Sequence, residues 1–234
     1  MLEFRRLVRP ATLFGVLATA VGLSAPGAAQ DVTLDEGSFA LFSNGREVGN
    51  EAFSIHRVGM GRTARILATA TVSFDGMEMR PALSTSSDFV VNSYENEVSG
   101  TRTADLSIVL ADNRYVSRIR SPQGETQREY RASPRTVILE EFVSHQYFLV
   151  ARFIDEGGGP IVVLDPKADR PSRMSLVSAE SEPFRLGGRQ IQARHLRLDG
   201  SGTIRDLWID DQGRVLRVEI PALGFRAERR PDGS

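Results

Sequence analysis

The stretch ILATATVSF, residues 66–74, decides the fold class of this chain. Apolar side chains recur there at every second position, and polar or smaller side chains fill most of the positions between them. This alternation is typical of a β-strand that has one face in the core and the other in water. The predicted inward set is Ile66, Ala68, Ala70, Val72 and Phe74, and the outward set is Leu67, Thr69, Thr71 and Ser73.

The same period of two returns along most of the chain. It recurs at Leu106–Leu110 and at Leu216–Ile220, where Val215, Arg217 and Glu219 are predicted to lie on the opposite face. Many strands joined by short turns predict a mostly β protein with a curved antiparallel sheet, as a half-barrel or open barrel. The turn signals are Asn44-Gly45, Asp75-Gly76, Asp112-Asn113, Pro122-Gln123-Gly124, Gly187-Gly188, Asp199-Gly200 and Gln212-Gly213.

One segment departs from the alternation. Between residues 137 and 155 the apolar side chains follow mixed three- and four-residue steps, Pro134 precedes them and glycines 157–159 follow. Proline near a start and glycine past an end favour one helical segment around 137–155, although its β-branched and aromatic content leaves strand as an alternative. The polar stretch Asp165–Pro171 is predicted to be a loop between strands Ile161–Leu164 and Arg173–Val177.

The first 29 residues have the order of a secretory signal peptide. Arg5, Arg6 and Arg9 precede the uncharged apolar run Ala11–Leu23, and a small-residue stretch ends at Ala29. The run is about 13 residues long, whereas a membrane span takes about 20, so we expect cleavage near Ala29 and no transmembrane segment in the mature chain. The remaining residues 30–234 are expected to form a single β-rich domain, periplasmic or secreted, by either the general or the twin-arginine export route.

Charge and cysteine content exclude several classes of function. The whole chain has a net charge of −1, and removal of three arginines and one glutamate with residues 1–29 leaves −3, which does not favour nucleic acid as a partner. The chain has no cysteine, which excludes disulfides, thiolate metal sites and a cysteine nucleophile. Stability must therefore come from an apolar core.

No catalytic or metal-binding motif stands out. The three histidines, His56, His145 and His195, lie far apart with none of the spacings common at zinc sites. GxSxG and SxxK serine motifs are absent, and the acidic pairs are expected at turns and helix ends. We therefore predict no enzyme, no cofactor and no metal site, and we expect His145 to be a partly exposed helix residue rather than part of a pocket lining.

The two ends of the expected domain resemble the lipoprotein-carrier-like (LolA/LolB-like) superfamily, and an uncharacterised exported branch of it in particular. The stretch FALFSNGREVG, residues 39–49, is similar to its opening hairpin, and LWIDDQGRVLRV, residues 207–218, is similar to its closing hairpin. The resemblance implies a strongly curved antiparallel sheet whose apolar concave face is covered by helical elements. It also implies a role in carrying lipids or the acyl chains of lipoproteins through the periplasm, without catalytic residues.

These observations lead to a first hypothesis of a non-catalytic binding module for a hydrophobic ligand, either a lipid or an acylated partner. The alternative is an envelope structural or protein-interaction module without a small ligand, and a hydrolase with an unrecognised site ranks last. An ordinary apolar core would use the same residue types as a ligand cavity. The residues predicted to line the ligand site are Phe142, Phe148, Trp208, Ile66, Val72 and Phe74.

Overall fold

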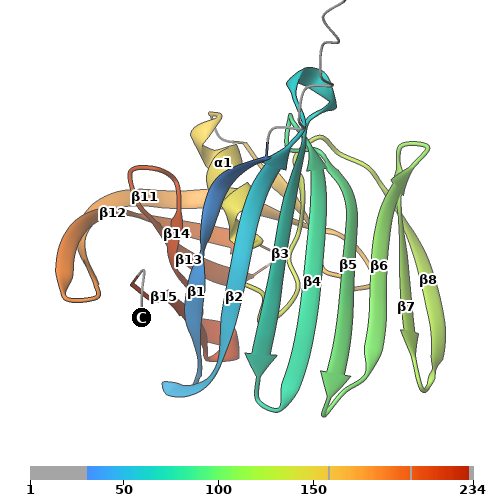
Figure 1. Cartoon of the computed structure of the whole chain (residues 1–234), viewed down its shortest axis with the longest axis horizontal. Coiled ribbons are helices and arrows are strands. Elements are labelled where there is room, and N and C mark those ends of the chain that lie inside the picture. Colours follow the sequence, from blue (N-terminus) through green and yellow to red (C-terminus); the bar gives the residue numbers. More distant parts are fainter. Residues whose placement is uncertain (1–30, 158, 201, 232–234) are drawn as a thin grey trace, which may run out of the picture.

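A computed structural model describes residues 31–157, 159–200 and 202–231, and Figure 1 shows its chain path. Fifteen strands form one continuous sheet in the order β8-β7-β6-β5-β4-β3-β2-β1-β15-β14-β13-β12-β11-β10-β9. All neighbouring strands are antiparallel except β9 and β10, which are parallel. The prediction of a curved, mostly β, antiparallel sheet with one helix is confirmed, and the sheet is unclosed. The predicted signal peptide lies outside the described residues.

The first half of the sheet is a meander of eight strands. They are β1 (Asp31–Ser43), β2 (Arg46–Val58), β3 (Arg65–Phe74), β4 (Met77–Ser86), β5 (Val91–Gly100), β6 (Ala104–Ala111), β7 (Arg114–Ser121) and β8 (Gly124–Arg131). A short 3-10 turn, Gly61–Thr63, joins β2 to β3.

The second half holds the only helix among the described residues. Its elements are β9 (Thr136–Ile138), α1 (Tyr147–Asp155), β10 (Ile161–Leu164), β11 (Ser172–Leu186), β12 (Arg189–Gly200), β13 (Thr203–Ile209), β14 (Val215–Ile220) and β15 (Phe225–Arg229). A 3-10 turn, Pro221–Leu223, leads into β15. This last strand pairs with β1 and so joins the two halves at the centre of the sheet.

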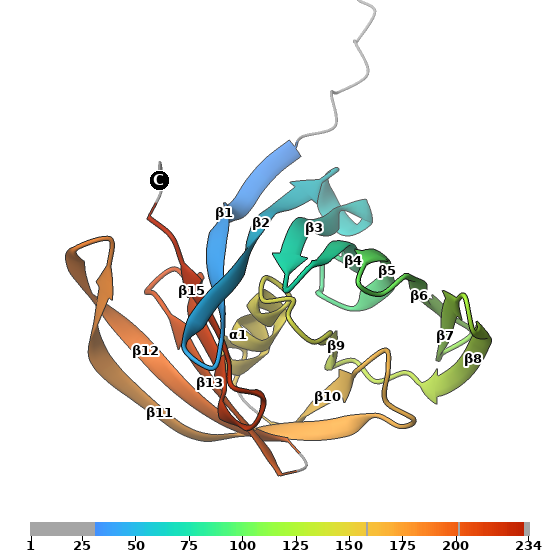
Figure 2. The same cartoon turned by 90° about the horizontal axis from the view of Figure 1, so that it is seen from below.

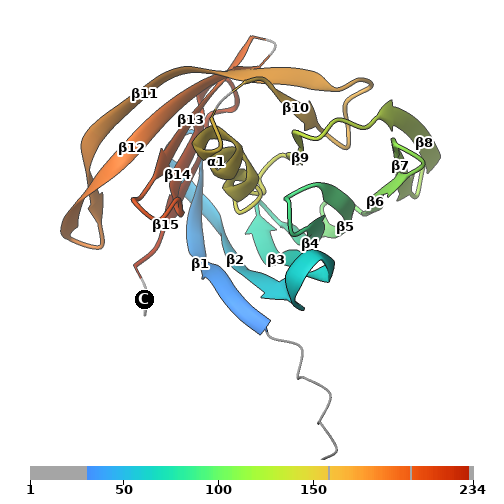
Figure 3. The same cartoon turned by 90° about the horizontal axis from the view of Figure 1, so that it is seen from above.

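The two halves curve toward each other around α1. Figures 2 and 3 show the helix enclosed between them, with β11 and β12 reaching across one side. The free edges approach through the loop that follows β10: Arg128 of β8 pairs with Asp169 at 2.9 Å, and the Tyr130 hydroxyl donates to the Ala168 carbonyl at 2.9 Å. The predicted loop 165–171 therefore bridges the opening that separates β8 from the other half.

The predicted turns separate the strands as expected. Asn44, Asp75, Asp112 and Asn113 adopt positive φ angles between 46° and 62°, a conformation that Asn and Asp tolerate better than most residues. Gly49, in the opening hairpin, meets a different requirement: a Cβ there would lie 1.8 Å from the Ser73 carbonyl oxygen of β3. Only glycine lets β2 and β3 approach so closely at this point.

One large core fills the concave side. The inward set predicted for residues 66–74 belongs to it: Ile66, Ala68 and Val72 are fully buried, and Phe74 is 5 % exposed. Tyr147, Leu149, Val150, Ala151 and Phe153 of α1 are also buried in this core. The helix thus occupies the concave side instead of covering it from outside.

The helix is shorter than the segment predicted for it. It begins at Tyr147, not near residue 137, because Thr136–Ile138 pairs with β10 as a parallel edge strand and Leu139 N–H donates to the Leu164 carbonyl at 3.1 Å. Turns occupy the residues between. Both alternatives for this segment were therefore partly right, with strand at its start and helix at its end.

A β-bulge changes the face assignment predicted for β14. The register shifts between Trp208 and Ile209, so Leu216 becomes the extra residue opposite the β13 strand. Leu216 packs with Trp208 in a small cluster on the outer face, whereas Val215 and Val218 join the main core. The prediction that Leu216 and Val218 share a face is wrong, because a one-residue insertion moves a side chain to the other side of the sheet.

Candidate ligand-binding site

Two of the six residues predicted to line a ligand site form an aromatic stack within the core. The Phe142 ring lies 4.0 Å from the Phe74 ring and nearly parallel to it, and both meet Phe225 edge-on at 5.7 and 6.0 Å. Ile66 and Val72 are fully buried in the same core. These four side chains pack against protein, and Phe225 of β15 is the partner that the sequence analysis did not include.

Trp208 lies elsewhere. It belongs to the outer cluster with Phe184, Ala193 and Leu216, on the side of the sheet away from α1. Its indole stacks on the His195 ring at 4.2 Å, and its Nε1 donates to a Glu182 carboxylate oxygen at 2.5 Å. A signal for this was present in the sequence, since Trp208 stands between Leu207 and Ile209 and alternation places it on the face opposite to theirs.

A buried hydrogen-bonded pair, Glu51 and His145, ties the segment before α1 to the centre of the sheet. One Glu51 oxygen accepts from His145 Nδ1 at 2.6 Å and from the His145 backbone N–H at 2.8 Å, and the other accepts from the Ser144 N–H at 2.7 Å. The side chains of Glu51 and His145 have no exposed area, and the His145 ring stacks over Phe53. The expectation that His145 is a partly exposed helix residue is wrong.

A second buried carboxylate lies in the same segment. Glu140 accepts from the Tyr94 hydroxyl at 2.5 Å and from Asn96 Nδ2 at 2.8 Å, and Lys167 Nζ lies 3.6 Å from its other oxygen. Burial, and next the negative charge of Glu140, raise the pKa of Tyr94 well above its usual value. The strands β5 and β2 thus hold the two ends of the 140–146 turn through carboxylates.

These two networks position the chain and are closed to solvent. Glu51, Ser144 and His145 combine residue types found in hydrolases, but each is at most 1 % exposed, so a substrate in solution does not reach them in this conformation. In the part of the chain that the structure describes, no group of three or more histidine, aspartate or glutamate side chains is arranged to hold a metal ion.

Core side chains line a pocket between the ends of β1 and β2, helix α1 and the turn that joins β13 to β14. Its volume is about 290 Å³, close to the lower end of the range for small-molecule sites. Its apolar wall consists of Leu34, Ile55, Phe89 and Phe148. Phe148 is the one residue of the predicted set that lines it.

Helix α1 presents one stripe to this pocket. Phe148, Arg152 and Asp155 are spaced by four and three residues, which places them on the same helix face. The Arg152 guanidinium lies 4.8 Å above the centre of the Phe89 ring and pairs with Glu156 at 3.0 Å. The pocket wall is therefore both aromatic and cationic.

Phe89 is held over the pocket in an unusual backbone conformation. Its φ angle is +61°, which is rare for a bulky residue, and its N–H donates to the Ser86 carbonyl at 3.1 Å. The Ser86 hydroxyl accepts from the Asp88 and Val90 N–H groups at 3.2 Å. Strained residues of this kind concentrate at ligand sites, which favours a role for this ring at the surface.

The facing wall is the turn of the closing hairpin. Asp210 shapes this turn, because its carboxylate accepts from the Gln212 and Arg214 N–H groups at 3.0 and 2.9 Å and from Arg214 Nε at 2.7 Å. Gln212, Gly213 and Arg214 then line the pocket. The hairpin at residues 207–218 thus contributes to the site through its turn.

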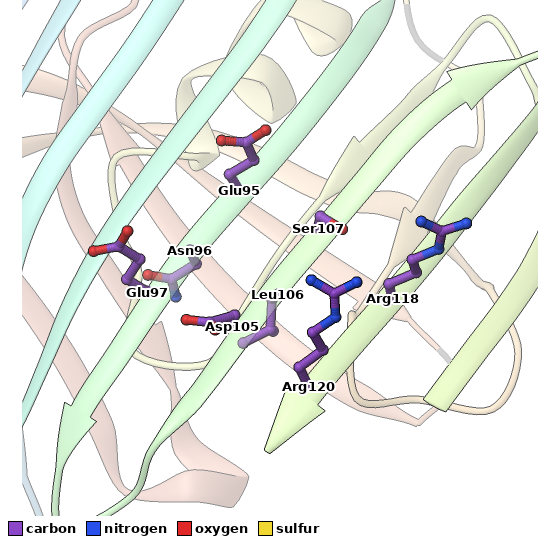
Figure 4. A pocket seen from close by; sticks show the side chains of 8 residues that line it. All are labelled: Glu95, Asn96, Glu97, Asp105, Leu106, Ser107, Arg118 and Arg120. Carbon is purple, nitrogen blue, oxygen red and sulfur yellow. The ribbon is translucent and has the colours of Figure 1, made fainter. Parts of the chain in front are cut away.

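Another hollow lies on the outer face of β5, β6 and β7. Figure 4 shows Glu97 and Asp105 on one side of it and Arg118 and Arg120 on the other. Arg118 is bound by Gln127 and Arg120 by Glu125, both at 3.0 Å. Its lining carries three acidic side chains and two arginines, a net charge of 2 − 3 = −1, and Leu106 is its one apolar residue, so it is a weaker candidate for a hydrophobic ligand.

Sequence reasoning missed Arg57, Phe89 and Arg152, which lie on three different elements of the pocket. Only the position of Arg57 had a readable signal, since it continues the inward positions of Phe53 and Ile55 by the same step of two.

Comparisons with protein-family models, with curated proteins and with solved structures found no significant match. None of the helices in the described ranges combines the length and the apolar character needed to cross a membrane.

Proposed function

We propose that this protein is a non-catalytic binding module for a hydrophobic ligand, either a lipid or the acyl chain of an acylated partner. We further propose that it acts in the periplasm or outside the cell after cleavage of the signal peptide. The observation that carries the proposal is the pocket in which the apolar core opens to solvent through Leu34, Ile55, Phe89 and Phe148. Leu34 is 38 % exposed at its mouth, an apolar side chain that a bound chain would cover.

The mechanism is burial of an alkyl chain against these four side chains. Each methylene removed from water contributes about 0.8 kcal/mol, so a few methylenes give measurable affinity without a covalent step. The Phe148 and Phe89 rings supply most of the contact area, and the rigid turn at Asp210 supplies the opposite wall. Release would follow from dilution or from a competing acceptor with a larger apolar surface.

The test uses N-phenyl-1-naphthylamine, a neutral probe that fluoresces when it enters an apolar site. We expect saturable fluorescence with the wild-type protein, weakened about five- to tenfold in affinity by the double change Phe89→Leu and Phe148→Leu. Phe42→Leu is the matched control, because the Phe42 ring packs under Arg226 at the far end of β1. Native mass spectrometry of protein purified from the periplasm would identify any co-purifying lipid.

The second candidate is a protein-interaction module of the envelope without a small ligand. Leu176 and Val177 favour it, since they are 39 % and 61 % exposed at a bulge in β11. A wild-type protein that neither binds the probe nor carries a lipid mass would contradict the ligand proposal and leave this candidate. Capture of an envelope partner that is lost on Val177→Asp would then support it.

A further inference from the structure

We infer that the ligand of the pocket beside α1 is an amphiphile with a single negative charge, an apolar chain that ends in an oxyanion bound by Arg57. This inference rests on the proposed binding function and names the class of ligand. It starts from the charges that line the pocket, which are three arginines and two aspartates, for a net charge of 3 − 2 = +1.

Four of the five charges already have a partner. Arg152 pairs with Glu156 at 3.0 Å, and Arg214 pairs with Asp210 at 2.7 Å. The two aspartates are also bound: Arg229 contacts both oxygens of Asp35 at 2.7 and 3.0 Å, and Arg194 pairs with Asp155. The two charges within each pair neutralise each other. These residues therefore make the pocket polar but need no counter-ion from a ligand.

Arg57 is the exception. It makes no ion pair and no side-chain hydrogen bond with any residue in the ranges that the structure describes. It lies on the inner face of β2, where Glu51, Phe53 and Ile55 precede it at steps of two, and it faces Ile66 across the strand pair. Past Phe53 and Ile55, the inner face of this strand therefore ends at the pocket in one exposed arginine that has no ion-pair partner.

The pocket thus has apolar side chains along its wall and one cation at its end, an arrangement that suits an amphiphile. An alkyl chain would lie against Ile55, Phe89 and Phe148, and its charged end would reach the Arg57 guanidinium. A guanidinium offers parallel N–H donors that fit the two oxygens of a carboxylate or of a phosphodiester. Because the pocket has only one unpaired positive charge, a singly charged head group suits it better than a dianion.

The experiment is calorimetric titration of the whole mature protein with three probes, each below its micelle-forming concentration. Decanoate carries a carboxylate, decan-1-ol has the same number of carbons without the charge, and 1-decanoyl-lysophosphatidylglycerol has the same acyl chain and carries a phosphodiester. We expect the wild-type protein to bind decanoate more tightly than decan-1-ol, by about tenfold. That preference should shrink as ionic strength rises, because a partly exposed charge pair is screened by salt.

Arg57→Gln tests the assigned residue. It should abolish the preference, so that decanoate binds no more tightly than decan-1-ol. Arg65→Gln is the matched control: Arg65 is one register position further along, on the outer face of β3, and it should keep the preference. Tighter binding of lysophosphatidylglycerol than of decanoate would assign the head group as a phosphodiester, and the reverse order would assign it as a carboxylate.

Two outcomes would overturn the inference, and they differ. If decanoate and decan-1-ol bind the wild-type protein equally well, or if Arg57→Gln keeps the preference, the charge assignment is wrong and the proposed binding function stands. If none of the three probes binds the wild-type protein, the proposed function itself fails, and the inference fails with it.

Discussion

At the scale of single residues, Glu51 connects the sheet to the turn that precedes α1. It lies in the middle of β2, it is fully buried, and both of its oxygens bind the turn that leads into α1. Its partner His145 lies 94 residues away along the chain. No local pattern around either residue links them, which explains why His145 was expected to be a partly exposed helix residue.

We expect Glu51→Gln to lower the free energy of unfolding by about 2–4 kcal/mol, because the amide turns a donor toward N–H groups that need an acceptor. Urea denaturation followed by circular dichroism measures the loss. Glu47→Gln is the matched control on the same strand, since Glu47 is exposed and its pair with Arg230 is a surface one. Equal losses for the two variants would show that the buried carboxylate has no special role.

At the scale of elements, alternation and turn signals predicted the strands and hairpins correctly. Features that depend on pairing between distant strands were not predicted. The hairpins at residues 39–49 and 207–218 are present, because two strands and a turn of suitable residues are encoded locally. The start of α1 was misplaced because Thr136–Ile138 becomes a strand only through β10, which lies later in the chain. The bulge at Leu216 likewise depends on the register with β13.

The candidate site was predicted in part for the same reason. Phe148 was found because it is an apolar residue in a short helical segment. Phe89 and Arg57 were missed because a loop residue and a strand end meet α1 only in the folded sheet.

We expect the buried face of helix α1 to contribute to the stability of the fold and the face at the pocket to contribute to ligand binding. Leu149 is fully buried, so Leu149→Ala should cost about 2–5 kcal/mol of stability, by loss of contacts and creation of a cavity. Phe148→Leu, at the pocket, should cost about 1 kcal/mol or less, and it should weaken uptake of the neutral probe. Thermal unfolding and probe titration of both variants measure the two effects, and a stability loss for Phe148→Leu as large as that for Leu149→Ala would contradict the division.

At the scale of the whole molecule, the pKa values of the four tyrosines reflect how far the two halves of the sheet exclude water from the core. Burial is the first cause of a raised pKa at each of Tyr94, Tyr115, Tyr130 and Tyr147, and it raises the pKa of Tyr115 to about 12. The folded state therefore favours the neutral phenol. The resulting stability is complete below the ordinary tyrosine pKa of about 10 and is lost as the pH rises through the raised values.

Spectrophotometric titration at alkaline pH should accordingly show little tyrosinate absorbance near pH 10, with the main rise at the pH where circular dichroism reports unfolding. Tyr115→Phe removes one of these ionisations and should move the alkaline unfolding midpoint upward relative to the stability of the same variant at neutral pH. Tyrosinate absorbance that develops fully near pH 10 in the folded protein would contradict this account.

The pairing of β15 with β1 has a consequence for how the chain folds. Residues at opposite ends of the described chain meet there, with Phe39 opposite Arg229 and Asp35 bound to Arg229 across a separation of 194 residues. Neighbouring hairpins can close early because their contacts are local, but this contact requires closure of a very long loop, which slows folding.

Until β15 is synthesised and pairs with β1, a nascent chain would thus contain two partly formed half-sheets, each with an unpaired strand at its inner edge. Such edges bind other chains readily. We expect a chain that stops before Phe225 to expose the edge of β1, to lose the bond to Asp35 and to associate into larger species in size-exclusion chromatography. A monomeric truncated chain would mean that β1 and β14 can pair directly, and that the last strand is dispensable for assembly.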